Sequence, residues 1–173
     1  MPEPLFRRVI GPDFEALPAP IRAVHGGEAK TYSGTCEVVR GTGLLSRVAA
    51  AIASLPAAGA NVPLKVTIDV DSRGETWNRI FDGRNMRSRM SERDGLLEER
   101  IGPTVFRFAL QPSGGAIDWK LMGVRWLGVP LPVSWFDKVK ARESLDGNRY
   151  RFDVRAEVPI VGLLVHYRGT LDP

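Results

Sequence analysis

The chain has 173 residues, 43% of them hydrophobic and 25% charged, with a formal net charge of +4. This is ordinary globular composition, and the longest apolar run, 48–55, is far shorter than the roughly 20 residues that span a bilayer. The opening residues MPEPLFRR lack the charged and apolar regions of a signal peptide. We therefore expect one soluble, cytoplasmic domain over residues 1–173, with no transmembrane segment.

The charged and metal-binding residue types exclude several functions. Arginines alternate with apolar residues in the expected strands, which is typical of a solvated sheet face and argues against nucleic-acid binding. Cys36 is the single cysteine and lies in a strand-like run without a neighbouring histidine, so a structural thiol is favoured over a nucleophile. His25 and His166 have no cysteine or aspartate cluster beside them, so no metal site is predicted. No phosphate- or dinucleotide-binding fingerprint is present, so no cofactor is predicted.

The elements follow in order along the chain. Residues 1–27 predict short helices broken by prolines, with His25 ending the last of them in a capping role, and a strand follows at about 29–40. Apolar residues at 44, 45, 48, 52 and 55 predict a helix over 44–55. From residue 61 onward the period changes to two and stays there, with hairpin signals at Asp82-Gly83 and Asp146-Gly147.

This order predicts an α+β fold in which residues 29–171 form a curved antiparallel β-sheet or β-barrel of about eight to nine strands. The short N-terminal helices precede it, and the helix after the first strand closes one side or end. A sheet this long does not stay flat and open with one apolar face, so it is expected to curl. A barrel of this size has room inside for side chains and one small ligand.

Strand alternation places three charged residues on inner faces. The parity that turns Leu97 and Ile101 inward also turns Glu99 inward; Glu143 and Arg79 follow the same rule in their strands. A buried charge is unfavourable unless it is paired, so Arg79 is expected between acids. Two interpretations stay open. The first is a structural ion-pair network, or a bulge that turns one of these charges outward. The second is a polar cluster in a cavity, where Arg79 helps to fix the polar end of a ligand and Glu99 and Glu143 act as acid or base.

Other inward residues complete the candidate site. Trp77, Ser88, Trp119 and Tyr167 are predicted to face the interior and to contact a ligand, whereas His166 is predicted to face solvent. The segment 126–136 is apolar, aromatic and punctuated by prolines, which exclude a central strand. This segment is predicted to be a loop packed over one barrel end, a ligand portal or a contact surface for another domain. The buried loop is the conservative interpretation, and an exposed segment would indicate a partner or a membrane surface.

Several short motifs follow one another along the chain in the order found in one bacterial family, catalogued as domain of unknown function 4166, and through them the chain resembles that family. They lie at residues 5–12 (LFRRVIGP), 17–18 (LP), 22–26 (RAVHG), 99–103 (ERIGP), 127–132 (LGVPLP), 151–154 (RFDV) and 162–169 (GLLVHYRG). Members of this family resemble stand-alone proteins or C-terminal partners of saccharopine-dehydrogenase-like domains. The resemblance implies a role near small-molecule metabolism and supplies no catalytic residues.

Three functions are compatible with this pattern. The favoured one is a binding module that holds a hydrophobic small molecule, such as a lipid or polyketide-like metabolite, in a barrel cavity. The first alternative is a cofactor-free isomerase, cyclase or hydrolase that uses Glu99 or Glu143. The second is a structural partner for an oxidoreductase, or a homodimer, formed through residues 126–136.

Overall fold

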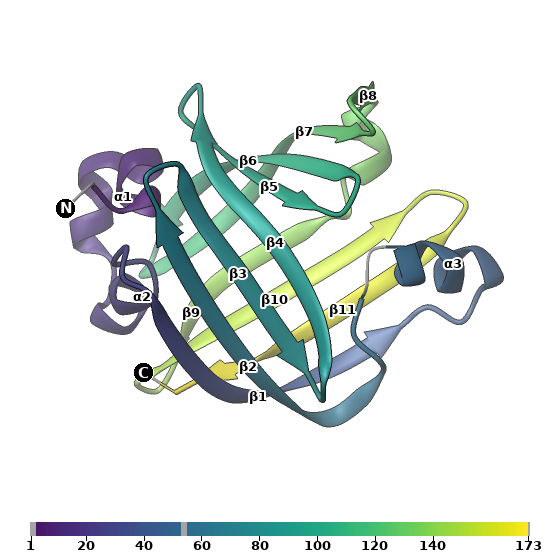
Figure 1. The fold of residues 1–173 in the computed structure, drawn as a ribbon, viewed down its shortest axis with the longest axis horizontal. Helices are drawn as coiled ribbons and strands as arrows, with labels where there is room; N and C mark the ends of the chain where they lie inside the picture. Colours follow the sequence, from purple (N-terminus) through teal and green to yellow (C-terminus); the bar gives the residue numbers. More distant parts are fainter. Residues whose placement is uncertain (1–2, 53–54, 173) are drawn as a thin grey trace.

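A computed structural model describes residues 3–52 and 55–172, and its strands form a closed antiparallel barrel (Figure 1). Three short helices come first: α1 (Leu5–Ile10), the 3-10 helix η1 (Gly11–Ala16) and α2 (Ala19–Val24). Helix α3 (Leu44–Ile52) follows the first strand, and the 3-10 helix η2 (Val133–Phe136) precedes the last three strands of the chain. No helix in the described ranges is long and apolar enough to cross a bilayer.

Eleven strands are described where about eight to nine were predicted. They are β1 (Lys30–Arg40), β2 (Gly59–Asp71), β3 (Gly74–Phe81), β4 (Arg84–Arg93), β5 (Leu96–Ile101), β6 (Thr104–Ser113), β7 (Ala116–Trp126), β8 (Val129–Leu131), β9 (Lys140–Asp146), β10 (Arg149–Val158) and β11 (Gly162–Leu171). The short strand β8 was not predicted, because Pro130 within it and Pro132 just after it exclude a central strand. It pairs with β7 alone, at an edge where a missing N–H is tolerated.

The barrel closes through β7. The strand order runs β6-β5-β4-β3-β2-β1-β11-β10-β9-β7, and β6 also pairs with β7. The first half of β7 pairs with β9 and its second half with β8, while β6 runs along its full length. The curved antiparallel barrel predicted from the period-two pattern is therefore confirmed, and its strands number more than predicted.

Two glycines allow β1 and β11 to run close together. A Cβ at Gly34 would lie 1.9 Å from the carbonyl oxygen of Thr170, and one at Gly169 would lie 2.2 Å from that of Thr35. No larger residue fits at either position without moving the backbone. Glycines of this kind mark tight bends in barrel strands.

The two ends of the barrel differ. The N-terminal helices cover one end, together with the β2–β3, β4–β5 and β6–β7 turns (Figure 1). Phe6 and Ile21 from these helices are fully buried in the barrel core. The β7–β8 and β10–β11 hairpins and α3 lie at the opposite end (Figure 1).

Helix α3 differs from its prediction in two respects. Its described part runs from Leu44 to Ile52, residue 55 is not helical, and residues 53–54 of the prediction lie outside the described residues. It also packs differently from expectation: Ser46 is buried and donates a 2.7 Å hydrogen bond to the carbonyl oxygen of Leu163 in β11. The apolar residues Leu44, Leu45 and Val48 are exposed.

Candidate functional site

The barrel interior contains a cavity of about 330 Å³. Its walls are mainly aliphatic and aromatic and include Leu64, Val66, Phe81, Phe106, Phe108 and Phe152. Trp126 also lines the cavity and is 46% exposed, so the cavity reaches solvent at the end that carries the β7–β8 hairpin. The end covered by the N-terminal helices forms its floor.

Arg79 holds a polar cluster on one wall. It lies on β3 and donates hydrogen bonds to Ser88 Oγ on β4, at 2.8 Å, and to Glu99 Oε1 on β5, at 3.2 Å. Its guanidinium also lies 5.0 Å from the ring centroid of Trp77, within the range of a cation–π contact. Burial acts to lower the pKa of Arg79, but the Glu99 carboxylate and nearby tyrosines raise it overall. The cluster therefore keeps a paired positive charge inside the barrel.

A second pair lies across the barrel. Glu143 on β9 lines the cavity, and its Oε2 lies 2.6 Å from Nε2 of His25, which follows α2. His25 is fully buried, and its Nδ1 has no hydrogen-bond partner among the described residues. The pair joins the floor of the cavity to the N-terminal helices.

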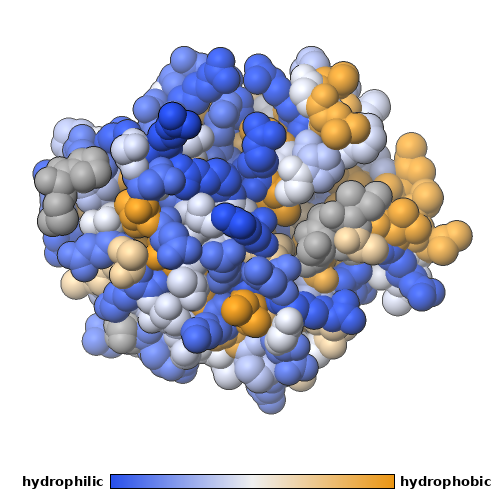
Figure 2. Space-filling view, viewed as in Figure 1, coloured by the Kyte–Doolittle hydropathy of each residue, from blue (hydrophilic) through white to orange (hydrophobic). Residues whose placement is uncertain are grey.

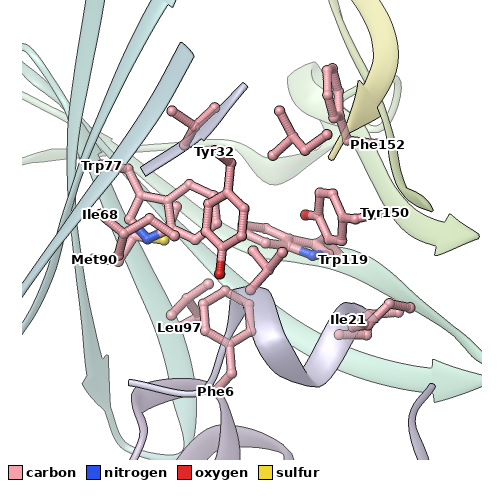
Figure 3. Packing of buried hydrophobic residues seen from close by; sticks show 14 of the residues in the cluster. Phe6, Ile21, Tyr32, Ile68, Trp77, Met90, Leu97, Trp119, Tyr150 and Phe152 are labelled. Atoms are coloured by element: carbon pink, nitrogen blue, oxygen red, sulfur yellow. The ribbon is translucent and has the colours of Figure 1, made fainter. Parts of the chain in front are cut away.

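Aromatic rings surround His25. The Phe6 ring stacks on the imidazole with centroids 3.6 Å apart, and Trp77 lies on a near-parallel ring plane at 5.6 Å. Figure 3 shows Phe6 extending from the N-terminal helical segment toward Tyr32, with Trp77 and Trp119 above it. These contacts fix the imidazole so that its nitrogen meets Glu143.

Burial raises the pKa of three further groups. The pKa of Glu75 is raised by burial, although the hydrogen bond from Trp77 Nε1, at 2.8 Å, opposes the rise. Burial raises the pKa of Tyr167 to about 12, and burial together with the Glu143 carboxylate raises that of Tyr150 well above its usual range. Both tyrosines line the cavity and stay protonated as hydrogen-bond donors at neutral pH.

The structure brings together most of the residues that the sequence singled out. The lining includes Arg79, Glu99, Glu143, Trp77, Trp119 and Tyr167. Ser88 is 1% exposed and lies behind Arg79, outside the lining, so its position does not suit direct ligand contact. Arg79 pairs with Glu99 and not with Glu143, because β3 and β5 both neighbour β4 whereas β9 lies elsewhere in the barrel.

Three residues of the site were missed or misread. His25 occupies the C-cap position of α2, as predicted, but its side chain is buried beside Glu143 instead of acting at the helix end. No periodicity indicates this, because the contact joins residues 118 apart. Glu75 shares the parity of Trp77 and Arg79, so alternation already contained its signal. Tyr150 is likewise buried in β10 and lines the cavity, and alternation along that strand places it on the inner face.

Two other predictions concern the surface. His166 was expected to face solvent; its side chain is 22% exposed and lies 2.8 Å from Asp153 Oδ1. The buried-loop interpretation of residues 126–136 is wrong. Trp126, Leu127, Val129 and Trp135 are all exposed, because β8 is an edge strand that projects beyond the barrel wall.

The fold and the site define a closed antiparallel β-barrel with an apolar interior cavity that carries paired charges. Within the described residues, 3–52 and 55–172, no group of three histidine, cysteine, aspartate or glutamate side chains lies close enough together to hold a metal ion. The chain belongs to the family described as Domain of unknown function (DUF4166), whose model matches residues 17–171. No curated protein in the comparison matches the chain.

Proposed function

We propose that the protein binds one small hydrophobic molecule inside the barrel. The observation that carries the proposal is the cavity of about 330 Å³, lined by aliphatic and aromatic side chains and reached from one end. Ligand sites in proteins occupy roughly 300–1,000 Å³ and combine apolar walls with a few polar groups. Arg79, Glu99, Glu143 and Tyr167 supply those polar groups here.

The charges favour an uncharged polar group on the ligand. Arg79 is already paired with Glu99, and the second carboxylate in the lining, Glu143, is paired with His25. A carboxylate or phosphate bound beside Arg79 would face both acids, because Lys140, the lining cation without an ion pair among the described residues, is exposed at the start of β9. That position is unfavourable for an anion in a low-dielectric interior. A hydroxyl or carbonyl group can exchange hydrogen bonds with Tyr167 and Arg79 at no such penalty. A neutral lipid or polyketide-like metabolite fits this description.

Fluorescent probes test the binding. We expect the neutral probe N-phenylnaphthylamine to bind with one site per protein and its anionic analogue anilinonaphthalene sulfonate to bind more weakly. Ala141 lines the cavity, so Ala141→Trp should abolish binding by filling it. Ala109, in β6 and outside the lining, gives the control Ala109→Trp, which should bind normally.

Native mass spectrometry adds an independent readout. A co-purifying molecule in a defined ratio, absent from Ala141→Trp, would support the proposal and identify the chemical class. Failure of the neutral probe to bind, together with an unliganded mass for the wild-type protein, would overturn it.

The Glu143–His25 pair supports a second candidate function, proton transfer on the bound molecule. A cavity-lining carboxylate hydrogen-bonded to an imidazole has the composition of a general base. The extracted ligand is incubated with the protein in deuterium oxide, and deuterium incorporation is measured by mass spectrometry. Incorporation with wild type and not with Glu143→Gln is expected. Equal incorporation with both would contradict this second function while leaving binding intact.

A further inference from the structure

Helix α3 turns the apolar side chains of its first half away from the protein. Leu44, Leu45 and Val48 are 74%, 56% and 51% exposed, whereas Ser46 is the buried side chain among those described in this helix. An amphipathic helix of a globular protein normally shows the opposite arrangement, with its apolar stripe on the core. The hydrogen bond from Ser46 to the carbonyl oxygen of Leu163 holds α3 in this orientation.

Two hairpins at the same barrel end also present apolar tips. Leu127 in the β7–β8 turn is 67% exposed with φ 49°, and Ile160 in the β10–β11 turn is 96% exposed with φ 69°. Left-handed backbone disfavours bulky residues, and β-branched ones most, so local folding does not explain these choices. At the β3–β4 and β4–β5 turns the equivalent left-handed positions hold Asp82 and Asp94, the residue type that such turns prefer.

These apolar groups surround the cavity mouth. Figure 2 shows orange side chains at the right of the view, over α3 and the β10–β11 hairpin, and at the upper right, over the β7–β8 hairpin. Trp126 is both half exposed and part of the cavity lining, and Leu55, just beyond α3, lines the cavity too. The exposed apolar surface is thus continuous with the apolar interior. We call these exposed apolar side chains the rim; they are Leu44, Leu45, Val48, Trp126, Leu127, Trp135 and Ile160.

Cations accompany the rim. Exposed basic side chains lie on α3 or next to the turns and strand ends at this barrel end: Arg47, Arg84, Arg125, Lys138, Lys140 and Arg155. Two exposed acids, Asp82 and Asp137, lie among them. A further acid at this end, Glu157, is half-buried and already forms ion pairs with Lys138 and Arg155. Basic residues beside exposed tryptophans and leucines are the composition of surfaces that bind anionic membranes.

We propose that the rim docks on the surface of an anionic phospholipid bilayer, with α3 and the tips Leu127 and Ile160 inserted among the headgroups. The apolar side chains stand apart around the cavity opening, and lipid headgroups can fill the spaces between them. The exposed Trp126 and Trp135 suit the membrane–water interface, where tryptophan is enriched. Docking would place the cavity mouth against lipid, so that a hydrophobic ligand passes between bilayer and barrel without crossing water. The docking itself does not depend on ligand binding.

Vesicle co-flotation tests the proposal. We expect the protein to float with vesicles of equal parts phosphatidylcholine and phosphatidylserine, and to be released by high salt. The double variant Leu45→Ser/Ile160→Gly should weaken this binding by about tenfold or more, because two inserted side chains are lost. Glycine at position 160 also relieves the left-handed backbone, so the variant should fold at least as well there. The control Met122→Ser removes an exposed apolar side chain from β7, away from the turns, and should float normally.

The outcomes separate docking from cavity binding. The rim variants should bind N-phenylnaphthylamine as wild type does, whereas Ala141→Trp should lose the probe and still float. Absence of wild-type protein from the floated fraction would overturn the proposal. So would a dimer in analytical ultracentrifugation that Leu45→Ser/Ile160→Gly dissociates, because the rim would then be a contact between two copies.

Discussion

The imidazole of His25 and the carboxylate of Glu143, 118 residues apart in sequence, meet at 2.6 Å inside the barrel. The contact joins the N-terminal helices to β9 and places a hydrogen-bonded pair at the cavity floor. Both side chains are buried, so removing either one leaves the other buried without its partner and destabilises the folded protein.

Removing the acid of this pair should destabilise the protein strongly. We expect Glu143→Leu to lower the free energy of unfolding by about 3 kcal/mol, because His25 loses its buried partner. Glu143→Gln keeps an acceptor for the imidazole and should lose about 1 kcal/mol. Urea unfolding measures both. Asp118→Asn, in the exposed pair with Arg142, is the control and should change stability by less than about 1 kcal/mol.

A double-mutant cycle tests the Arg79–Glu99 pair. Arg79→Met leaves Glu99 buried and unpaired and should lose about 3 kcal/mol of unfolding free energy. Replacing both residues, as Arg79→Met/Glu99→Leu, should be less destabilising than the sum of the single changes, because no uncompensated charge is left. The same cycle on the exposed Arg168–Glu37 pair should give a coupling below about 1 kcal/mol. Additive effects at Arg79 and Glu99 would contradict the pairing.

The raised pKa of Glu75 predicts a pH dependence of stability. A carboxyl group whose folded pKa lies above the ordinary value of 4.5 binds more protons in the folded state, so stability falls as pH rises from 4.5 through the folded pKa. The slope from one such group is at most about 1.4 kcal/mol per pH unit. In Glu75→Gln this contribution disappears, so the variant should gain on wild type as pH increases. Parallel stability–pH curves for the two proteins would refute the assignment.

Cys36 should be unreactive in the folded protein. Burial raises the pKa of its thiol to about 11, from 9.0, so the thiolate fraction near neutral pH is about 100-fold lower than for a free cysteine. Reaction with dithionitrobenzoate, followed by absorbance, should be slow in buffer and fast in urea. Rapid labelling of the native protein would indicate that β1 and β2 open readily around this residue.

Alternation along the strands predicted which residues point inward, including Glu99, Glu143 and Arg79, because a closed barrel preserves the period of two on every strand. It did not predict the partners, which depend on strand neighbours and on the N-terminal helices. The exposed face of α3 was not predictable either. A helical period identifies the apolar side of a helix, but nothing in it states whether that side faces a core or the surroundings.

The covering of one barrel end by the N-terminal helices has a kinetic consequence. Along the described chain, the cavity is reached from the end that carries the rim, so a bound molecule and its successor would use the same passage. The bound molecule must then dissociate before a second molecule can enter, because a competitor cannot reach the cavity from the opposite end. Exchange under excess competitor would proceed at the dissociation rate of the resident, whatever the competitor's concentration.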